Sequence, residues 1–196
     1  MGEQTSEQVV EQFRPTSGRI TGVLGLVLAG AVIVVGLLDR DQFPILLVAI
    51  AALAAALIWA SMLRPRLWVT DQHVVLRNMV TTTRIPLAAV EKVAVRQVVA
   101  IHAGDRRYVS PAVGRSLRQS LPTQKAKNQT ALTSYPVFVE ERLHHLVDEA
   151  RVRTGVKPYS DEQLALAAQV ERSWAWPEIA ALALGTVAVV VALLTL

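Results

Sequence analysis

Cysteine is absent from this chain of 196 residues, and the three aromatic residue types together make up only 5% of it. Without a thiol the chain forms no disulfide, no thiolate metal site and no cysteine nucleophile, which fits a reducing compartment. The sequence also lacks a glycine-rich phosphate loop, a nucleophile elbow and a pair of carboxylates at catalytic spacing. We therefore expect no enzymatic activity and no cofactor.

Histidine is scarce as well, and the nearest approach to a metal cluster is the pair His144 and His145. If this segment is helical, Glu141 and Glu149 lie one turn from His145 on either side. Neighbouring helical side chains point about 100° apart, so only one histidine joins each face, and two ligands alone do not hold a metal. We expect no metal site here.

Charge is missing from three long apolar stretches, Ile20–Leu38, Phe43–Met62 and Ile179–Leu196. Each runs for 18 to 20 residues without Asp, Glu, Lys or Arg, and a helix of that length crosses a hydrocarbon core about 30 Å thick. The stretches predict an integral membrane protein with a transmembrane helical hairpin over residues 20–62 and a third transmembrane helix over residues 174–196. The lack of ionisable residues in the spans argues against an ion pathway, a proton relay or a transporter.

The first 19 residues are a predicted polar tail, and they decide how the first span is interpreted. A cleaved signal peptide has a basic start and a short apolar core. This tail instead carries Glu3, Glu7 and Glu11 and precedes an apolar run of 19 residues. We therefore expect the first span to remain in the mature protein.

Basic residues are concentrated between the second and third spans, where residues 63–173 hold 17 Lys and Arg against 10 Asp and Glu. Segments rich in Lys and Arg stay in the cytoplasm, so the N-terminus and this central segment are predicted inside and the C-terminus outside. A bias towards Ala, Val, Leu and Arg suggests a bacterium, and hence its plasma membrane. Trp59, Trp174 and Trp176 fall near the inner ends of the spans, where indole rings anchor helices at the membrane interface.

Small residues recur at a spacing of four within the spans, which predicts close packing of the helices. Packing of the hairpin within one chain explains this spacing, and a homo-oligomer or a partner membrane protein is the alternative. The pairs are Gly25 and Ala29, Ala51 and Ala55, Ala52 and Ala56, Ala181 and Gly185, and Ala188 and Ala192.

Over residues 63–114 polar and apolar residues alternate, which is typical of β-strands. The alternation is clearest where Val93 and Val95 share one face and Lys92, Ala94 and Arg96 share the other. Five or six short antiparallel strands in one small domain are predicted. The first three are Arg66–Thr70, Val74–Val80 and Arg84–Leu87, with a turn at Thr81–Thr83, and the others follow between Glu91 and Ser110.

Several motifs within Arg66–Gly114 resemble those of a known family. VTD leads into the strand VVLRN, TTTRIPLAAVEKV follows, and GDRRYV forms a hairpin. In this order they are similar to the pleckstrin-homology-like (PH-like) domains that actinobacteria attach to membrane hairpins. The resemblance implies a small, partly open β-barrel closed by a C-terminal helix, which serves as a docking surface and has no enzymatic activity.

A basic loop is predicted over residues 115–133. This stretch has Arg115, Arg118, Lys125 and Lys127 but no acidic residue, and it shows little periodicity. It either clamps a membrane surface or a partner, or it is a solvated linker, which is the interpretation we favour.

Two amphipathic helices are predicted over residues 134–173. The first has apolar residues at helical spacing and is the candidate lid of the barrel. The second begins at Ser160, which has capping-box spacing to Gln163, and continues towards Trp174. The apolar residues of the first helix are Val139, Leu143, Leu146, Val147 and Ala150.

Six basic residues fall on the predicted strands and turns, and several of them could project together from one rim of the β domain. Such a rim would bind headgroup phosphates or an acidic partner, whereas ordinary solvation is the alternative that we favour. Only Trp68 and Tyr108 are aromatic in this region, too few to stack single-stranded nucleic acid. The six residues are Arg77, Arg84, Lys92, Arg96, Arg106 and Arg107.

Two functions fit these features. In the leading hypothesis the chain is a non-enzymatic accessory or scaffold protein that docks partner proteins at the inner face of the membrane. Its spans would then contact another membrane protein or a second copy of the chain. In the alternative, the basic rim binds anionic lipid headgroups, since each Lys or Arg near such a surface contributes about 1 kcal/mol.

Overall fold

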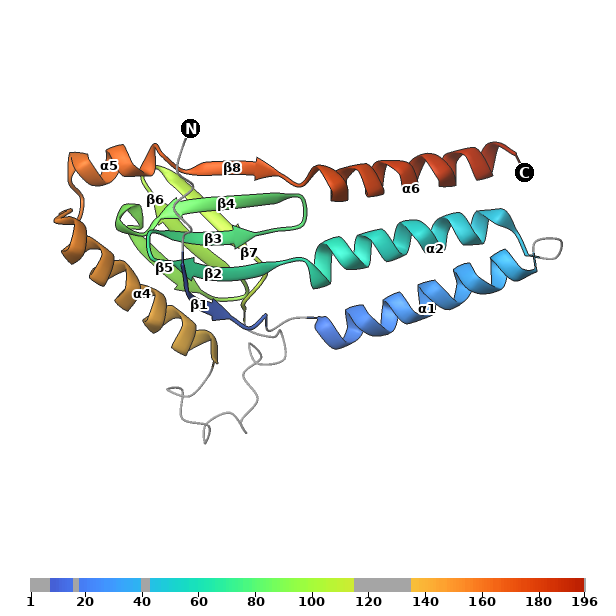
Figure 1. The fold of residues 1–196 in the computed structure, drawn as a ribbon, viewed down its shortest axis with the longest axis horizontal. Coiled ribbons are helices and arrows are strands. Elements are labelled where there is room, and N and C mark those ends of the chain that lie inside the picture. The colour runs from blue at the N-terminus through green and yellow to red at the C-terminus, as the bar shows by residue number, and fades with distance from the viewer. Residues whose placement is uncertain (1–7, 16–17, 40–42, 115–134, 196) are drawn as a thin grey trace. The chain divides into compact units, whose positions relative to one another are not determined.

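The computed structural model describes residues 8–15, 18–39, 43–114 and 135–195. The basic loop predicted over residues 115–133 and the start of the predicted tail lie outside the described residues. The chain forms two compact units, whose helices and strands are labelled in Figure 1. The β unit comprises Met1–Ser17, Arg66–Asn78 and Thr82–Ser173, and the helical unit comprises Gly18–Pro65, Met79–Thr81 and Trp174–Leu196.

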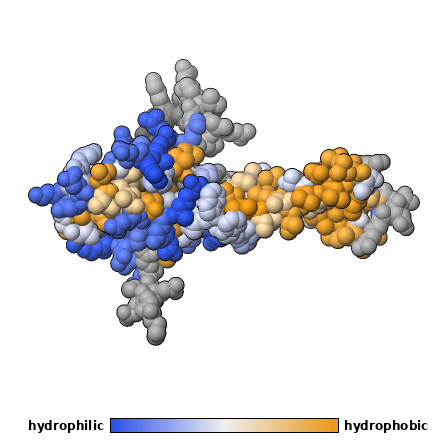
Figure 2. Space-filling view, turned by 90° about the horizontal axis from the view of Figure 1, so that it is seen from above, coloured by the Kyte–Doolittle hydropathy of each residue, from blue (hydrophilic) through white to orange (hydrophobic). Residues whose placement is uncertain are grey.

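The helical unit contains three long apolar helices. They are α1 (Arg19–Leu38), α2 (Ile45–Ile58), which continues as the π-helical turn η1 (Trp59–Leu63), and α6 (Trp176–Leu194). All three are long and apolar enough to cross a membrane, which confirms the three apolar helices that the sequence predicts. Many of their large apolar side chains are exposed, and Figure 2 shows hydrophobic residues over much of the surface of these helices.

Glycine allows close approach between the helices of this unit. α2 packs against both α1 and α6. A Cβ atom added at Gly25 of α1 would lie 2.9 Å from Cδ1 of Ile58, and one added at Gly185 of α6 would lie 3.2 Å from Cα of Leu53. Packing within one chain therefore accounts for these two members of the predicted small-residue pairs.

The β unit is built from two sheets. The five-stranded sheet has the order β1-β2-β3-β4-β8, and the three-stranded sheet has the order β5-β6-β7. The described residues thus form eight strands in two sheets, whereas the sequence pattern predicts five or six strands in one meander. The strands are β1 (Val9–Phe13), β2 (Arg66–Thr70), β3 (His73–Arg77), β4 (Thr81–Pro86), β5 (Lys92–Val95), β6 (Val99–Ala103), β7 (Arg106–Ser110) and β8 (Glu171–Trp174).

The hydrophobic core of the β unit follows the alternation of its strands. Leu67 and Val69 of β2 are fully buried, and Val93 and Val95 of β5 are buried as well. Lys92, on the other face of β5, is exposed. The alternation predicted for this strand is therefore confirmed.

Two helices pack on this core, α4 (Tyr135–Thr154) and α5 (Asp161–Ala167). The apolar stripe predicted for the first helix is buried, with Val139 and Leu143 fully inaccessible to solvent. Ser160 is the N-cap of α5, and its Oγ accepts the backbone N–H of Gln163 at 3.3 Å, as the capping spacing predicts. A short 3₁₀ turn, η2 (Leu87–Ala89), contacts both helices.

The tail predicted over residues 1–19 contains a strand, which is a correction to the sequence analysis. In β1, Phe13 pairs with Leu67 of β2 and is 2% exposed in the core. The pairing partner lies more than 50 residues away in the sequence. Because so short a strand depends on such a partner, its own five residues do not reveal it.

Two hydrogen bonds join the N-terminal segment to α4. The Nε of Arg142 donates to Oε2 of Glu11 at 2.7 Å, and the backbone N–H of Arg14 donates to the Tyr135 hydroxyl oxygen at 2.6 Å. Donation of this hydrogen bond to the Glu11 carboxylate raises the pKa of Arg142, because it favours the charged guanidinium. Burial raises the pKa of the Tyr135 phenol, because it disfavours the ionised form.

The turn predicted at Thr81–Thr83 is wrong, because these residues begin β4. Thr83 and Ile85 of this strand are buried, and β-branched residues of this kind fit a pleated, half-buried surface. The chain reverses at residues 78–80 instead, and β4 ends at Pro86. A proline at a strand end removes no interior ladder bond.

The second amphipathic helix is shorter than its pattern predicts. α5 ends at Ala167, and the residues expected to continue it towards Trp174 form β8 instead. β8 is an edge strand of the five-stranded sheet, beside β4. Pairing with that sheet, which is distant in sequence, overrides the weak helical periodicity.

Candidate functional site

Three arginines lie on the face of the five-stranded sheet that points away from the hydrophobic core. Arg66 of β2 is opposite Arg77 of β3, and Arg77 is opposite Thr82 of β4. Arg84 follows Thr82 by two residues and shares its face, whereas Leu67, next to Arg66, is fully buried on the other face. We call Arg66, Arg77 and Arg84 the arginine face.

The arginine face places like charges side by side. Arg66 and Arg77 are direct cross-strand partners, and like charges in that arrangement destabilise a sheet. The described strands β2, β3 and β4 contain no acidic residue. Guanidinium groups bind carboxylates and phosphates in a planar, bidentate manner, so this face is suited to an anionic group or surface.

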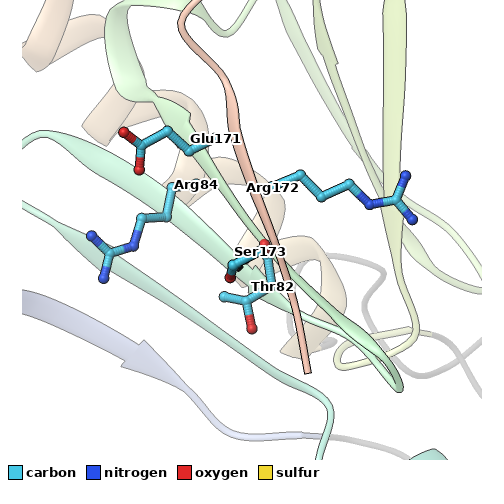
Figure 3. A pocket seen from close by; sticks show the side chains of 5 residues that line it. All are labelled: Thr82, Arg84, Glu171, Arg172 and Ser173. Carbon is cyan, nitrogen blue, oxygen red and sulfur yellow. Dashed lines mark hydrogen bonds between the residues drawn. The ribbon is translucent and has the colours of Figure 1, made fainter. Parts of the chain in front are cut away.

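A cavity of about 410 Å³ lies at the β4–β8 edge of the same sheet (Figure 3). In Figure 3, the side chains of Glu171 and Arg84 lie on one side of β8, and Arg172 extends to the other side. Thr82 and Ser173 lie next to each other beside β8 in Figure 3. Ser173 Oγ donates to the carbonyl oxygen of Thr82 at 3.4 Å. The lining is polar and has charges of both signs, unlike the mostly apolar pockets that enclose small molecules. The cavity thus extends the arginine face with hydroxyl and carboxylate groups.

A second group of basic residues crosses the three-stranded sheet. Lys92 of β5 is opposite His102 of β6, and His102 is opposite Arg107 of β7. The three side chains therefore form one row on one face of this sheet. Lys92 and Arg107 are exposed, and His102 is half-buried. We call these three residues the basic row.

The six residues that the sequence groups on one rim are thus divided between two sheets. The structure brings Arg77 together with Arg84 on one sheet, and Lys92 together with Arg107 on the other. The remaining two join neither group. Arg96 follows the end of β5, and Arg106 faces away from its neighbour Arg107 because successive strand residues alternate.

Sequence reasoning missed one member of each group, Arg66 and His102. The place of each residue in its group is set by the cross-strand register. That register can be counted from the sequence only if the position of the hairpin turn is known. For the basic row, the turn at Gly104 and Asp105 supplies that signal, because counting back from it pairs Arg107 with His102. For the arginine face the turn was misplaced at Thr81–Thr83, so the register could not be counted.

The predicted interface anchors are exposed side chains of the helical unit. Trp59 begins η1, Trp176 begins α6, and Trp174 precedes α6 by two residues. Their exposed fractions are 53%, 71% and 53%. Their role at a membrane interface stays a prediction.

A buried ion pair lies in the helical unit, and sequence reasoning missed it. Arg64, directly after η1, donates from Nε to Oε1 of Glu178 in the first turn of α6 at 2.6 Å. The side chains are 5% and 14% exposed. The pair joins the residue after η1 to the first turn of α6, so it is a structural contact of this unit.

The paired histidines of α4 have separate partners. His144 Nε2 lies 3.1 Å from the carbonyl oxygen of Val93, and His145 Nδ1 lies 3.4 Å from Oε1 of Glu149. Within the part of the chain that the structure describes, no group of three or more His, Asp and Glu residues is placed to hold a metal ion. The candidate sites are therefore the two basic surfaces.

Comparison of the chain with protein-family models, with curated proteins and with solved structures finds no match. The resemblance to PH-like domains consequently stays a prediction. The functional argument depends on the two basic surfaces and the three apolar helices.

Proposed function

We propose that this chain is a non-enzymatic, membrane-anchored docking protein. Its three apolar helices cross a bacterial plasma membrane, and its β unit, a PH-like domain on the cytoplasmic side, binds an acidic partner protein through the arginine face. The observation that carries the proposal is the arginine face itself, three cations that share the outward face of one sheet, whose strands continue into the apolar helices.

The joins between that sheet and the apolar helices are short. Arg66 follows Leu63, the last residue of η1, by three positions, and Trp174 precedes Trp176, the first residue of α6, by two. A chain extends at most about 3.6 Å per residue, so these joins span no more than about 11 Å and about 7 Å. This limit holds at whatever angle the two units meet. A partner bound at Arg66 would therefore be held close to the bilayer.

The orientation follows from the distribution of charge. Residues 63–173 hold 17 basic residues against 10 acidic ones, and such segments are retained in the cytoplasm. Two sheets packed around one core, with α4 against that core, are compatible with the PH-like proposal.

The test compares two triple variants that lose the same charge. R66Q/R77Q/R84Q removes the arginine face, and R96Q/R106Q/K157Q removes three exposed cations elsewhere in the β unit. Full-length protein is extracted from bacterial cells in mild detergent and analysed for bound proteins. We expect an acidic partner that dissociates in high salt, remains with the control variant and is reduced at least about tenfold by the arginine-face variant. Equal loss in both variants, or a partner insensitive to charge, would contradict the proposal.

Anionic lipid headgroups are a second candidate for the same face. The observation that favours them is that Arg66 lies at most about 11 Å from the end of an apolar helix. That distance is comparable to the Debye length at physiological salt, so the charge of a headgroup is only partly screened at Arg66. The test is mass spectrometry of lipids retained by detergent-extracted protein. Selective retention of phosphatidylglycerol over phosphatidylcholine, lost in R66Q/R77Q/R84Q but kept in R96Q/R106Q/K157Q, would favour lipid over a protein partner.

A further inference from the structure

We infer that the basic row, Lys92, His102 and Arg107, is a binding site for a phosphate group. This site lies on the three-stranded sheet, apart from the arginine face, and it does not depend on the proposed function. The register places the three residues on consecutive strands, each directly opposite the next.

The spacing of the strands suits one tetrahedral anion. Neighbouring strands lie about 4.7–4.9 Å apart, so the backbones at Lys92 and Arg107 are separated by about 10 Å with His102 between them. The long side chains of Lys92 and Arg107 can lean inward over the imidazole from both sides. A bound anion would then meet cationic donors from two directions and a ring nitrogen from below.

The local charge is positive and lacks a compensating acid on that face. The neighbouring row on the same face consists of Ala94, Ala100 and Val109. Among the described residues, neither Lys92 nor Arg107 forms an ion pair. Lys92 and Arg107 lie on either side of His102, so both cations attract an anion placed over the ring.

Two acidic residues lie near the row but do not occupy it. Glu91 precedes Lys92, and its Oε1 accepts the backbone N–H of Gly104 at 3.0 Å. Asp105 is exposed at the turn between β6 and β7. Glu91 directly precedes Lys92 and so faces the other way, and Asp105 lies in the turn itself, so neither carboxylate belongs to the row.

The donors favour phosphate over a carboxylate. Arginine supplies a planar pair of N–H groups, lysine supplies a compact ammonium and histidine supplies a ring N–H. A phosphate monoester has three acceptor oxygens that can meet all three donors, whereas a carboxylate has only two oxygens. The same phosphate chemistry is offered by a soluble phosphorylated compound and by a lipid headgroup.

The experiment follows the His102 ring in the full-length protein. Histidine is labelled with ¹³C at Cε1, the protein is kept in a neutral detergent, and the H102Q variant identifies the resonance. Inorganic phosphate is then titrated at constant ionic strength, with chloride replacing it in the control. We expect a saturable shift of the His102 signal with phosphate alone.

Three variants test the row. K92Q and R107Q should each weaken phosphate binding at least about tenfold, since each removes a charge-assisted hydrogen bond. R106Q is the matched control, because it removes an exposed cation from the same strand on the opposite face, and it should change binding less than about twofold. Equal weakening by R106Q and R107Q would mean that phosphate is attracted by the general positive charge of the β unit and not by the basic row. That result would overturn the site.

A second arm distinguishes the source of the phosphate. The labelled protein is placed in phosphatidylcholine nanodiscs with or without phosphatidic acid, in buffer free of phosphate. A His102 shift that requires phosphatidic acid and is lost in R107Q would identify a lipid headgroup. A shift seen only with soluble phosphate would identify a soluble phosphorylated compound. No saturable shift in either arm would refute the inference.

Discussion

The helical unit and the β unit are stabilised by contacts of different range. Each apolar helix satisfies its own backbone hydrogen bonds, and its length and composition can be recognised within one continuous stretch. The core of the β unit instead joins Phe13, Leu67 and Val139, which are far apart in the chain. A potential membrane span is thus a local property of the sequence, whereas a strand depends on partners elsewhere.

The largest loss of stability should come from truncating Phe13, the core residue that β1 supplies from far away in the sequence. Phe13 is 2% exposed, and Phe13→Ala should reduce the free energy of unfolding by about 3–5 kcal/mol through lost burial and a cavity. Val10 lies on the same strand but is 52% exposed, so Val10→Ala should change it by less than about 0.5 kcal/mol. Denaturant unfolding of full-length protein in detergent measures both. Equal effects would show that β1 does not belong to the core.

The ion pair between Arg64 and Glu178 is one point at which the helical unit also depends on a contact distant in sequence. Arg64→Met leaves the nearly buried Glu178 carboxylate without this partner, and we expect a loss of about 1.5–3 kcal/mol. Replacing both residues in R64M/E178L should recover most of that loss, because two apolar groups need no partner. Thermal denaturation in detergent, monitored by tryptophan fluorescence, compares the single and the double variant. A double variant no more stable than the single one would argue against the pair.

Two glycines of α1 test whether close packing in the helical unit is specific. A Cβ at Gly36 would overlap Cγ2 of Val48, whereas nothing lies within 4 Å of a Cβ at Gly30. Gly36→Ala should therefore destabilise the unit by about 1–3 kcal/mol through overpacking. Gly30→Ala should be neutral or stabilise it by up to about 1 kcal/mol through helix propensity. The same thermal assay measures the midpoint of unfolding of both variants. Equal changes in that midpoint would refute close packing at Gly36.

The smallest expected effect is a change in how the stability of the β unit depends on pH. Burial raises the pKa of Tyr135 above the ordinary phenol value of 10.0. Below pH 10 the phenol is neutral in both states, so its contribution to stability is complete there. Above that pH the unfolded phenol ionises first, and stability falls as the pH rises towards the folded pKa. Tyr135→Phe should remove this part of the decline, measured as the midpoint of thermal unfolding on either side of pH 10. An unchanged slope would contradict burial of the phenol.

What the sequence predicts follows the same division. The three apolar helices, the buried stripe of α4 and the cap of α5 are encoded by residues close together, and each was found. β1 and β8 are not predicted, because each is a segment of only four or five residues that becomes a strand by pairing with a sheet distant in sequence. The turn predicted at Thr81–Thr83 is wrong because these β-branched residues favour a strand, and the predicted hairpin is therefore shifted along the chain.

The candidate site was predictable in composition but not in arrangement. The sequence identifies the cations, yet register decides which of them share a face. Arg106 and Arg107 are adjacent in sequence and face opposite ways, whereas Lys92 and Arg107 are 15 residues apart and share a row. His102 joins that row only because the turn at Gly104 fixes the pairing.

Cysteine labelling offers the most direct test of the central claim, that the helices span the membrane and hold the β unit inside. The natural chain has no cysteine, so single variants report one position each. Thr195→Cys, after α6, and Arg106→Cys, on an exposed strand position, are expressed in bacterial cells and treated with a membrane-impermeant maleimide. We predict that Thr195→Cys is labelled in intact cells and Arg106→Cys only after lysis. Labelling of Arg106→Cys in intact cells, or recovery of the protein in the soluble fraction without detergent, would contradict the account.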